Sequence, residues 1–442
     1  MSDRLRHAVT PGYLLLCLLL GGSAQGVWGN LLLQLIGVAL IGWTFWPNDR
    51  AGLSRSARML GWLPIGAVVL MLAQLVPLPP VVWTSLPGRT PVIDGYRLLG
   101  QPRPWLPLSL TPYESLASLP AMIPPLAILA AILRRGAYRS SWLALVVVGD
   151  ALLSIVLGAL QATTGRYYPY PFSSVGSATG FFANGNFLGT LLLTALAYLA
   201  ALASGGRRRK RRLAPALALG PLLVLLVGLV ISRSLAALLL TLPIALASML
   251  LFGAARERRQ RWVLWVAASA GVLAVIAFTR LPAVTDPNNA VSTATRTHIY
   301  RTTAQAIVQH LPFGSGAGSF PRVYALHERP ADFQGAFVNH AHDEYLEIAL
   351  ELGFPGVILL AAFLWWWGGR ALAVWRSRAS SAFDRAATVA SAAILAHGLV
   401  DFPIRNAAIA GVLAASVALM AEPQRWSARA ASHERPARHL TL

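Results

Sequence analysis

Two histidines separated by one residue, His340 and His342, lie immediately before a long apolar run. Metal ligands on a helix are usually three or four residues apart and no third ligand is obvious, so this spacing does not favour a zinc site. A neutral imidazole at a membrane surface is better suited to remove a proton from a hydroxyl, as a general base does. The alternative interpretation is a polar cap at the start of the following helix.

Acidic residues continue the same segment. Asp343, Glu347 and Glu351 recur every four residues, which predicts three carboxylates along one face of a helix. Glu347 and Glu351 would then lie within an apolar segment, where a charge is costly unless it faces the protein interior. We therefore expect this face to point toward a site inside the protein.

Arginines supply a second kind of chemistry. Arg233 lies in Ser232-Arg233-Ser234 between two strongly apolar runs, with no room for a loop, and Arg296 lies in a polar stretch. A charge at a membrane-embedded turn indicates a functional site, although the side chain could instead reach toward lipid headgroups. Because guanidinium groups bind phosphate through paired hydrogen bonds, these arginines suit an anionic, lipid-linked substrate.

Two further groups of polar residues leave alternatives open. Asn184 and Asn186 could cap a helix or bind sugar hydroxyls, and capping explains only one of the two. His397, Asp401 and Arg405 lie where the last two apolar runs meet. Asp401 and Arg405 either pair with each other across this turn or belong to a functional site.

The elements that must position these residues are membrane helices. The chain has 442 residues, of which 56% are hydrophobic and 12% charged, with a mean hydropathy of +0.57. Soluble domains carry about 25% charged residues, so this is an integral membrane protein. Apolar runs of about 20 residues recur, and the alternating segments of closed barrels are absent. We predict an all-α polytopic protein with about twelve spans, near residues 11–27, 30–46, 59–79, 115–133, 141–162, 182–203, 213–231, 234–253, 262–279, 346–367, 386–402 and 405–421.

The basic residues predict the orientation of these spans. The formal net charge is +20, but most basic residues gather in short segments between alternate pairs of spans, including the run 207–212. This distribution is typical of cytoplasmic loops, so we expect a topology anchor and not nucleic-acid binding. Both termini are then cytoplasmic, although Arg4 and Arg6 before the first apolar run leave a cleaved signal peptide as an alternative. Cys17 is the only cysteine, which excludes disulfides and cysteine metal sites.

The longest polar segment, residues 280–345, is predicted to lie on the opposite side. Its five arginines are balanced by five carboxylates, unlike the arginine-rich cytoplasmic loops. A helix is expected over about 296–310, followed by a tight turn at Gly314–Gly318. This glycine pattern does not indicate a dinucleotide site, because no strand precedes it.

Five groups of these residues together resemble the O-antigen ligase superfamily, which also includes Wzy-type polysaccharide polymerases and protein O-oligosaccharyltransferases. The resemblance covers about residues 175 to 420, and the order and spacing of short motifs carry it. The motifs are Phe181–Phe187, Ser232–Ser234, Arg296–Tyr300 with Pro312–Phe320, Ala341–Leu346 with Glu351–Gly356, and His397–Pro403.

The resemblance implies a GT-C-like, metal-independent and inverting glycosyltransferase of the bacterial inner membrane, without a cofactor and with its site facing the periplasm. Its donor would be a glycan on undecaprenyl diphosphate, and its acceptor a hydroxyl of lipid A core, of another glycan chain or of a protein. Residues 1–174 would form N-terminal transmembrane helices and 175–421 the ligase-like domain, including a large periplasmic loop, 280–345, with short helices. Residues 422–442 would form a cytoplasmic tail.

The resemblance also implies roles for single residues. Arg233 and Arg296 would bind the donor diphosphate, and His342 would deprotonate the acceptor hydroxyl. Where the family usually has His-Asn, this chain has His342-Asp343, and that carboxylate could raise the basicity of His342. The full set of substrate-binding candidates is Arg233, Arg296, His340, Asn184, Asn186, Asp343 and Asp401.

A transporter or flippase of lipid-linked glycans is the alternative function class. Transporters often contain internal inverted repeats, and none relates the two halves of this chain. The motifs do not distinguish a ligase from a polymerase or a protein-glycosylating enzyme, because these enzymes share them.

Overall fold

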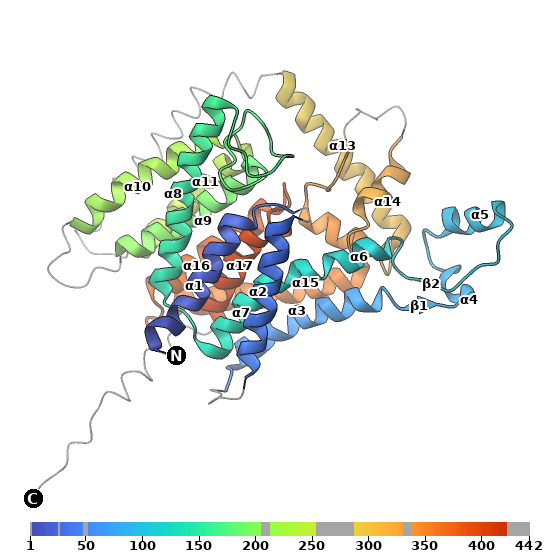
Figure 1. The fold of residues 1–442 in the computed structure, drawn as a ribbon, viewed down its shortest axis with the longest axis horizontal. Coiled ribbons are helices and arrows are strands. Elements are labelled where there is room, and N and C mark those ends of the chain that lie inside the picture. Colours follow the sequence, from blue (N-terminus) through green and yellow to red (C-terminus); the bar gives the residue numbers. More distant parts are fainter. Residues whose placement is uncertain are drawn as a thin grey trace, which may run out of the picture.

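The computed structural model describes residues 2–24, 27–46, 52–204, 213–252, 287–329 and 337–421. Within these residues the chain is mostly helical (Figure 1). The strands found there are β1 (Pro77–Leu78) and β2 (Leu106–Pro107), which pair antiparallel with Pro77 opposite Pro107. The predicted all-α architecture is confirmed for these residues.

The helices follow the chain in this order. The N-terminal part contains α1 (Asp3–Leu20), α2 (Trp28–Phe45), α3 (Arg55–Ala73), α4 (Pro80–Trp83), α5 (Thr90–Leu98), α6 (Pro112–Ser118), the 3-10 turn η1 (Pro120–Met122), α7 (Ile123–Arg135) and α8 (Ser140–Thr164). The remainder contains α9 (Gly185–Ser204), α10 (Leu213–Ile231), α11 (Leu235–Met249), η2 (Leu250–Phe252), α13 (Pro287–His310), α14 (Phe320–His327), α15 (Glu344–Arg376), α16 (Ala382–His397), η4 (Pro403–Arg405) and α17 (Ala407–Ala421).

Six segments among the described residues are long and apolar enough to cross a membrane: Trp28–Phe45, Arg55–Ala73, Pro112–Arg135, Ser140–Thr164, Gly185–Ser204 and Glu344–Arg376. Three shorter apolar helices accompany them, Ala218–Ile231, Leu235–Met249 and Ala407–Ala421. A multi-pass membrane protein is therefore supported. The predicted count of twelve stays a prediction, and the predicted span 262–279 and tail 422–442 lie outside the described residues.

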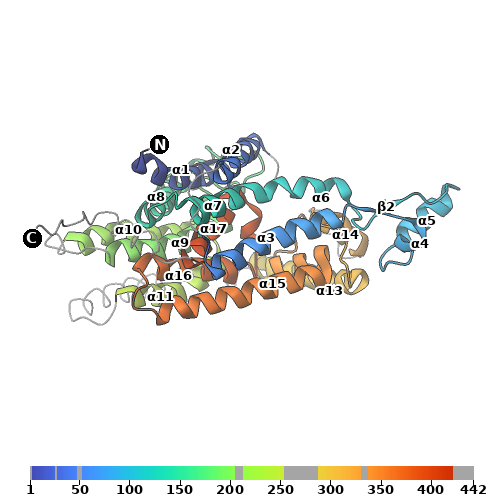
Figure 2. The same cartoon turned by 90° about the horizontal axis from the view of Figure 1, so that it is seen from below.

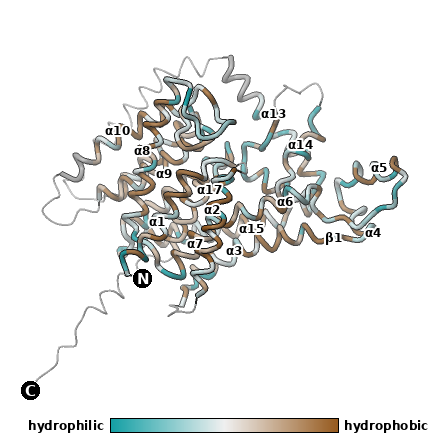
Figure 3. The backbone as a smooth tube through the Cα atoms, in the orientation of Figure 1, coloured by the Kyte–Doolittle hydropathy of each residue, from teal (hydrophilic) through white to brown (hydrophobic). Residues whose placement is uncertain are grey.

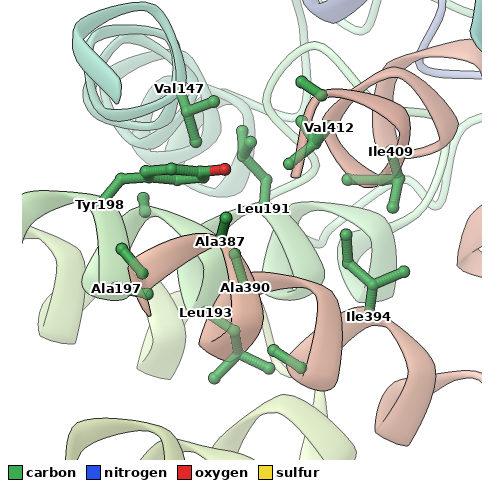
Figure 4. Close-up of a cluster of buried hydrophobic side chains, with 14 of the residues drawn as sticks. Val147, Leu191, Leu193, Ala197, Tyr198, Ala387, Ala390, Ile394, Ile409 and Val412 are labelled. Atoms are coloured by element: carbon green, nitrogen blue, oxygen red, sulfur yellow. The ribbon is translucent and has the colours of Figure 1, made fainter. Parts of the chain in front are cut away.

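Helix α9 forms the centre of the bundle, where it packs against α8, α10, α11 and α16. Nearly all of its side chains are buried. Figure 4 shows Leu191 and Tyr198 of this helix between Val147 of α8 and the small side chains of α16, among them Ala387. Small residues let membrane helices approach closely. The Tyr198 hydroxyl is satisfied by Ser416 Oγ of α17 at 2.8 Å.

Polar segments gather at one end of the bundle. Most of the long helices run along a common direction, and α13, α14 and the projecting α4–α5 segment lie toward the same end (Figure 2). Hydropathy follows this arrangement, with hydrophobic residues along the bundle and hydrophilic ones around α13 and α14 (Figure 3). This end holds the described part of the predicted polar loop.

The predicted helix and turn within the polar segment are confirmed. Helix α13 contains the expected 296–310 range and begins earlier, at Pro287. After it, Gly314, Gly316 and Gly318 all adopt positive φ, which glycine tolerates because it lacks a Cβ. The turn docks on α15 where that helix is kinked at Gly353, with Phe354 N donating to Pro312 O at 2.8 Å. The glycines thus permit close backbone approach.

Candidate active site

His342 lies in the non-helical segment just before α15, and its backbone is left-handed with φ of 53°. The ring is about a quarter exposed, with a side-chain exposure of 25%. Its Nδ1 hydrogen-bonds to Asp401 Oδ1 at 3.1 Å. Because the carboxylate accepts the Nδ1 proton, the lone pair of the neutral ring lies on Nε2. A carboxylate in this position can orient a histidine ring so that Nε2 is able to accept a proton.

Asp401 lies in the loop after α16, with a side-chain exposure of 1%. Burial alone would raise the pKa of this carboxyl, but the hydrogen bond from His342 and the charges of His342, His397 and Arg296 hold its pKa below its usual range. An ionised Asp401 places a negative charge directly beside the His342 ring. Oδ2 of Asp401 is buried and has no hydrogen-bond partner within the described structure.

Helix α13 contributes two residues to this centre. Arg296 is half-buried, and its charge acts on both Asp401 and His397. One turn later, the Tyr300 hydroxyl donates to the carbonyl oxygen of His342 at 2.9 Å. The structure therefore brings Arg296, His342 and Asp401 together from three separate parts of the chain.

Asp343 caps the helix that follows it and, contrary to expectation, does not bind the His342 ring. Its Oδ1 accepts hydrogen bonds from Tyr345 N at 2.8 Å and Leu346 N at 3.0 Å, so Asp343 is the N-cap of α15. The carboxylate beside the His342 ring is Asp401 instead. The polar cap of α15, which was the alternative interpretation of the two histidines, is thus made by Asp343.

An ionic cluster lies between η4 and the first turns of α15, which follow His342 in the chain. Arg405 of η4 forms ion pairs with Glu344 at 3.2 Å, Glu347 at 3.2 Å and Glu351 at 3.3 Å. Burial would lower the pKa of Arg405, but the three carboxylates raise it above its ordinary value. His340 Nδ1 joins the cluster through Glu347 Oε1 at 2.9 Å.

This cluster rules out one alternative and corrects one expectation. Asp401 and Arg405 do not pair across their turn, since Asp401 binds His342 and Arg405 binds the glutamates. The third carboxylate beside Glu347 and Glu351 is Glu344 and not Asp343. The expectation that Glu347 and Glu351 face the protein interior is confirmed, because both are buried.

The Ser232–Ser234 turn connects α10 with α11 and places Arg233 on the surface with φ of 57°. Ser234 Oγ caps α11 by accepting from Ala237 N. The turn packs on the first residues of α9, where a Cβ at Gly185 would lie only 2.5 Å from Ser232 O. The backbone of the turn is therefore fixed beside the start of α9, and the Arg233 side chain is exposed.

The two predicted asparagines begin α9. Asn184 Oδ1 accepts from Asn186 N at 2.9 Å, which makes Asn184 the capping member of the pair. From the next turn of this helix, Thr190 Oγ1 bonds to Nδ1 of the fully buried His397 at 2.8 Å. His397 thus connects the start of α9 with Asp401, whose backbone N–H donates to His397 O.

Sequence reasoning missed two residues that contact His342 and one member of the ionic cluster. The Tyr300 contact requires knowing that α13 crosses the segment before α15, and spacing along the chain does not reveal this. Phe402 lies against both histidines, stacked on His340 at 4.0 Å and edge-on to His342 at 5.1 Å between ring centroids. Glu344 follows His342 closely in the sequence, but nothing in the spacing distinguishes it from the other acidic residues there.

Among the described residues, no three acidic, histidine or cysteine side chains are placed to hold a metal ion.

The family model described as O-antigen ligase matches residues 221–361. No curated protein matches the chain. The matched segment contains Arg233, Arg296 and His342, and it ends before Asp401. The match supports an O-antigen ligase or polymerase type of function and does not favour a transporter. Residues 221–361 therefore match the O-antigen ligase family model, in agreement with the resemblance found in the sequence over this segment.

Proposed function

We propose that the protein transfers a glycan from undecaprenyl diphosphate to an acceptor hydroxyl at the periplasmic face of the bacterial inner membrane. The observation that supports this most is the His342–Asp401 pair next to Arg296, in a chain whose residues 221–361 match the O-antigen ligase family model. A carboxylate-oriented imidazole suits deprotonation of a hydroxyl, and a neighbouring guanidinium suits a diphosphate leaving group.

The reaction is a single displacement. Nε2 of His342 takes the proton of the acceptor hydroxyl while its oxygen forms a bond to the anomeric carbon. The bond from that carbon to the diphosphate oxygen breaks, and undecaprenyl diphosphate leaves with the electron pair. Arg296 and Arg233 stabilise the charge on the departing diphosphate. Attack opposite the leaving group inverts the anomeric configuration, and the step requires neither a metal nor a cofactor.

Asp401→Asn tests the orientation of the base. The amide can donate to Nδ1 of His342, which would move the ring proton to Nε2 and remove the lone pair from the acceptor side. We expect kcat to fall about 10²- to 10⁴-fold, as when a catalytic histidine loses its carboxylate partner. The KM for the donor should change little. The measurement is single-turnover transfer from a lipid-linked glycan in proteoliposomes, and a kcat near the wild-type value would contradict the role of Asp401.

Arg296→Gln tests diphosphate binding. Loss of a charge-assisted hydrogen bond is expected to raise the donor KM by about tenfold or more, since such bonds contribute about 1.5–3 kcal/mol. The exposed Arg301 on the same helix provides the matched control, Arg301→Gln. An equal rise of KM in both variants would show that the effect is a general one of surface charge. Arg233→Gln should act in the same direction as Arg296→Gln.

The class of acceptor is tested in the cell. Deletion of the gene should leave lipid A core without long glycan chains if the acceptor is lipid A core, as for a ligase. Glycans limited to single repeats would indicate a polymerase, and loss of glycan from proteins would indicate a protein-glycosylating enzyme. Normal lipopolysaccharide, capsule and glycoproteins after deletion would contradict the proposal.

A further inference from the structure

We propose that Glu347, held by Arg405, is a positioning residue that fixes His342 as the base; this rests on the proposed function. Both oxygens of the Glu347 carboxylate bind the two residues that precede His342. Oε1 pairs with His340 Nδ1 at 2.9 Å, and Oε2 accepts from the backbone N–H of Ala341 at 3.0 Å. One side chain thus fixes the backbone on the N-terminal side of His342.

His342 needs such support because its backbone is left-handed, with φ of 53°. A residue other than glycine rarely adopts this conformation and keeps it only where the surroundings impose it. On the other side of His342, Asp343 caps α15 and Glu344 N donates to Gly398 O at 2.9 Å. His342 is therefore held between a fixed helix end and the Glu347 carboxylate.

The Glu347 carboxylate cannot move away from these partners. Its side chain is 1% exposed, and Arg405 Nη2 lies 3.2 Å from Oε1. Arg405 is itself bound by Glu351, whose Oε1 accepts from Phe320 N at the start of α14. The position of Glu347 thus depends on contacts with the segment before α15, with η4 and, through Arg405 and Glu351, with α14.

Glu347 also acts on the ring side of the site. It fixes His340, and the His340 ring stacks on Phe402 at 4.0 Å. Phe402 follows Asp401 directly in the chain and packs edge-on against His342. Glu347 therefore fixes the backbone before His342 and, through His340, also contacts Phe402, the residue that follows Asp401.

The experiment compares Glu347→Gln with Glu344→Gln as the matched control. Both residues are buried on α15 and bind Arg405, but Glu344 accepts from Ile404 N at 2.9 Å and does not bind residues 340 or 341 in the described structure. In proteoliposomes, Glu347→Gln should lower kcat about 10- to 100-fold, as losses of orienting residues do, with the donor KM unchanged. Glu344→Gln should keep kcat close to wild type.

A second readout does not need transfer activity. Acylation of histidines by diethyl pyrocarbonate, followed by mass spectrometry of the peptide containing His342, reports how firmly this ring is held. Glu347→Gln should increase the rate at His342 several-fold and leave the buried His310 unchanged. If Glu347→Gln does not fold, His340→Phe keeps a ring on Phe402 and removes one bond to Glu347. This variant should lower kcat without changing the donor KM.

Two results would overturn the positioning role. One is an equal loss of kcat in Glu347→Gln and Glu344→Gln, because the effect would then be that of the cluster as a whole. The other is an unchanged rate of acylation at His342. If the wild-type protein transferred no glycan, the proposed function would fail, while the acylation experiment would still decide whether Glu347 positions His342.

Discussion

Replacement of His342 with alanine is expected to abolish glycan transfer while leaving the protein folded in the membrane. A positioned general base contributes about 10²- to 10⁴-fold to a rate, and His342 is the residue that we assign to this role. Its backbone contacts through Tyr300 and α15 do not require the imidazole. The expected loss therefore lies in kcat and not in the amount of folded protein.

The measurement is single-turnover transfer in proteoliposomes, with folded protein quantified by size-exclusion chromatography in detergent. His327→Ala provides the control, because His327 lies on α14 and bonds to Gln309 outside the site. Near-normal transfer by His342→Ala would show that another group accepts the proton. Loss of transfer in both variants would point to a general defect.

Replacement of Arg405 with leucine is expected to give the largest loss of stability. The substitution leaves Glu344, Glu347 and Glu351 buried without their shared cation. Removal of one partner from a buried ion pair costs about 3–5 kcal/mol, because an uncompensated charge remains. The thermal unfolding temperature in detergent should fall sharply, and less folded protein should reach the membrane.

A combined variant separates charge from packing. When all three glutamates are replaced with glutamine in the Arg405→Leu protein, the uncompensated charges are removed. Much of the lost thermal stability should therefore return. Activity should not return with it, since Glu347 would no longer hold the segment before His342. An Arg405→Leu protein as stable as wild type would contradict the importance of the cluster.

Periodicity and composition predicted the parts of the fold that depend on local pattern. The helical bundle, the helix containing 296–310 and the glycine turn at 314–318 all follow from residue spacing, and the structure confirms them. The residue that caps a helix was harder to predict. The sequence suggests Asp343 as a partner of His342, but its side chain accepts from the first backbone N–H groups of α15 instead.

Long-range pairing limited the prediction of the site. His342 and Asp401 are 59 residues apart, and only the packing of α15 and α16 brings them within 3.1 Å. Asp401 and Arg405 are close in sequence, so a local pair was one of the two alternatives. Each instead binds a partner on another element, and such competition between local and distant partners is not visible in a single sequence.

Interior-facing carboxylates were predicted for a physical reason that the structure supports. Glu347 and Glu351 lie on an apolar helix, so they had to be buried with a cation or reach water. The identity of that cation, Arg405, required the tertiary structure.

The side of the membrane on which the site opens is the most direct test of this account. Helix α15 separates the exposed Phe337, before His342, from the exposed Arg378 at its other end. In a Cys17→Ser background, Phe337→Cys and Arg378→Cys can be treated with a membrane-impermeant maleimide in cells whose outer membrane is permeabilised. If the site is periplasmic, Cys at 337 should be labelled in intact spheroplasts and Cys at 378 only after lysis, and the reverse pattern would contradict a periplasmic site.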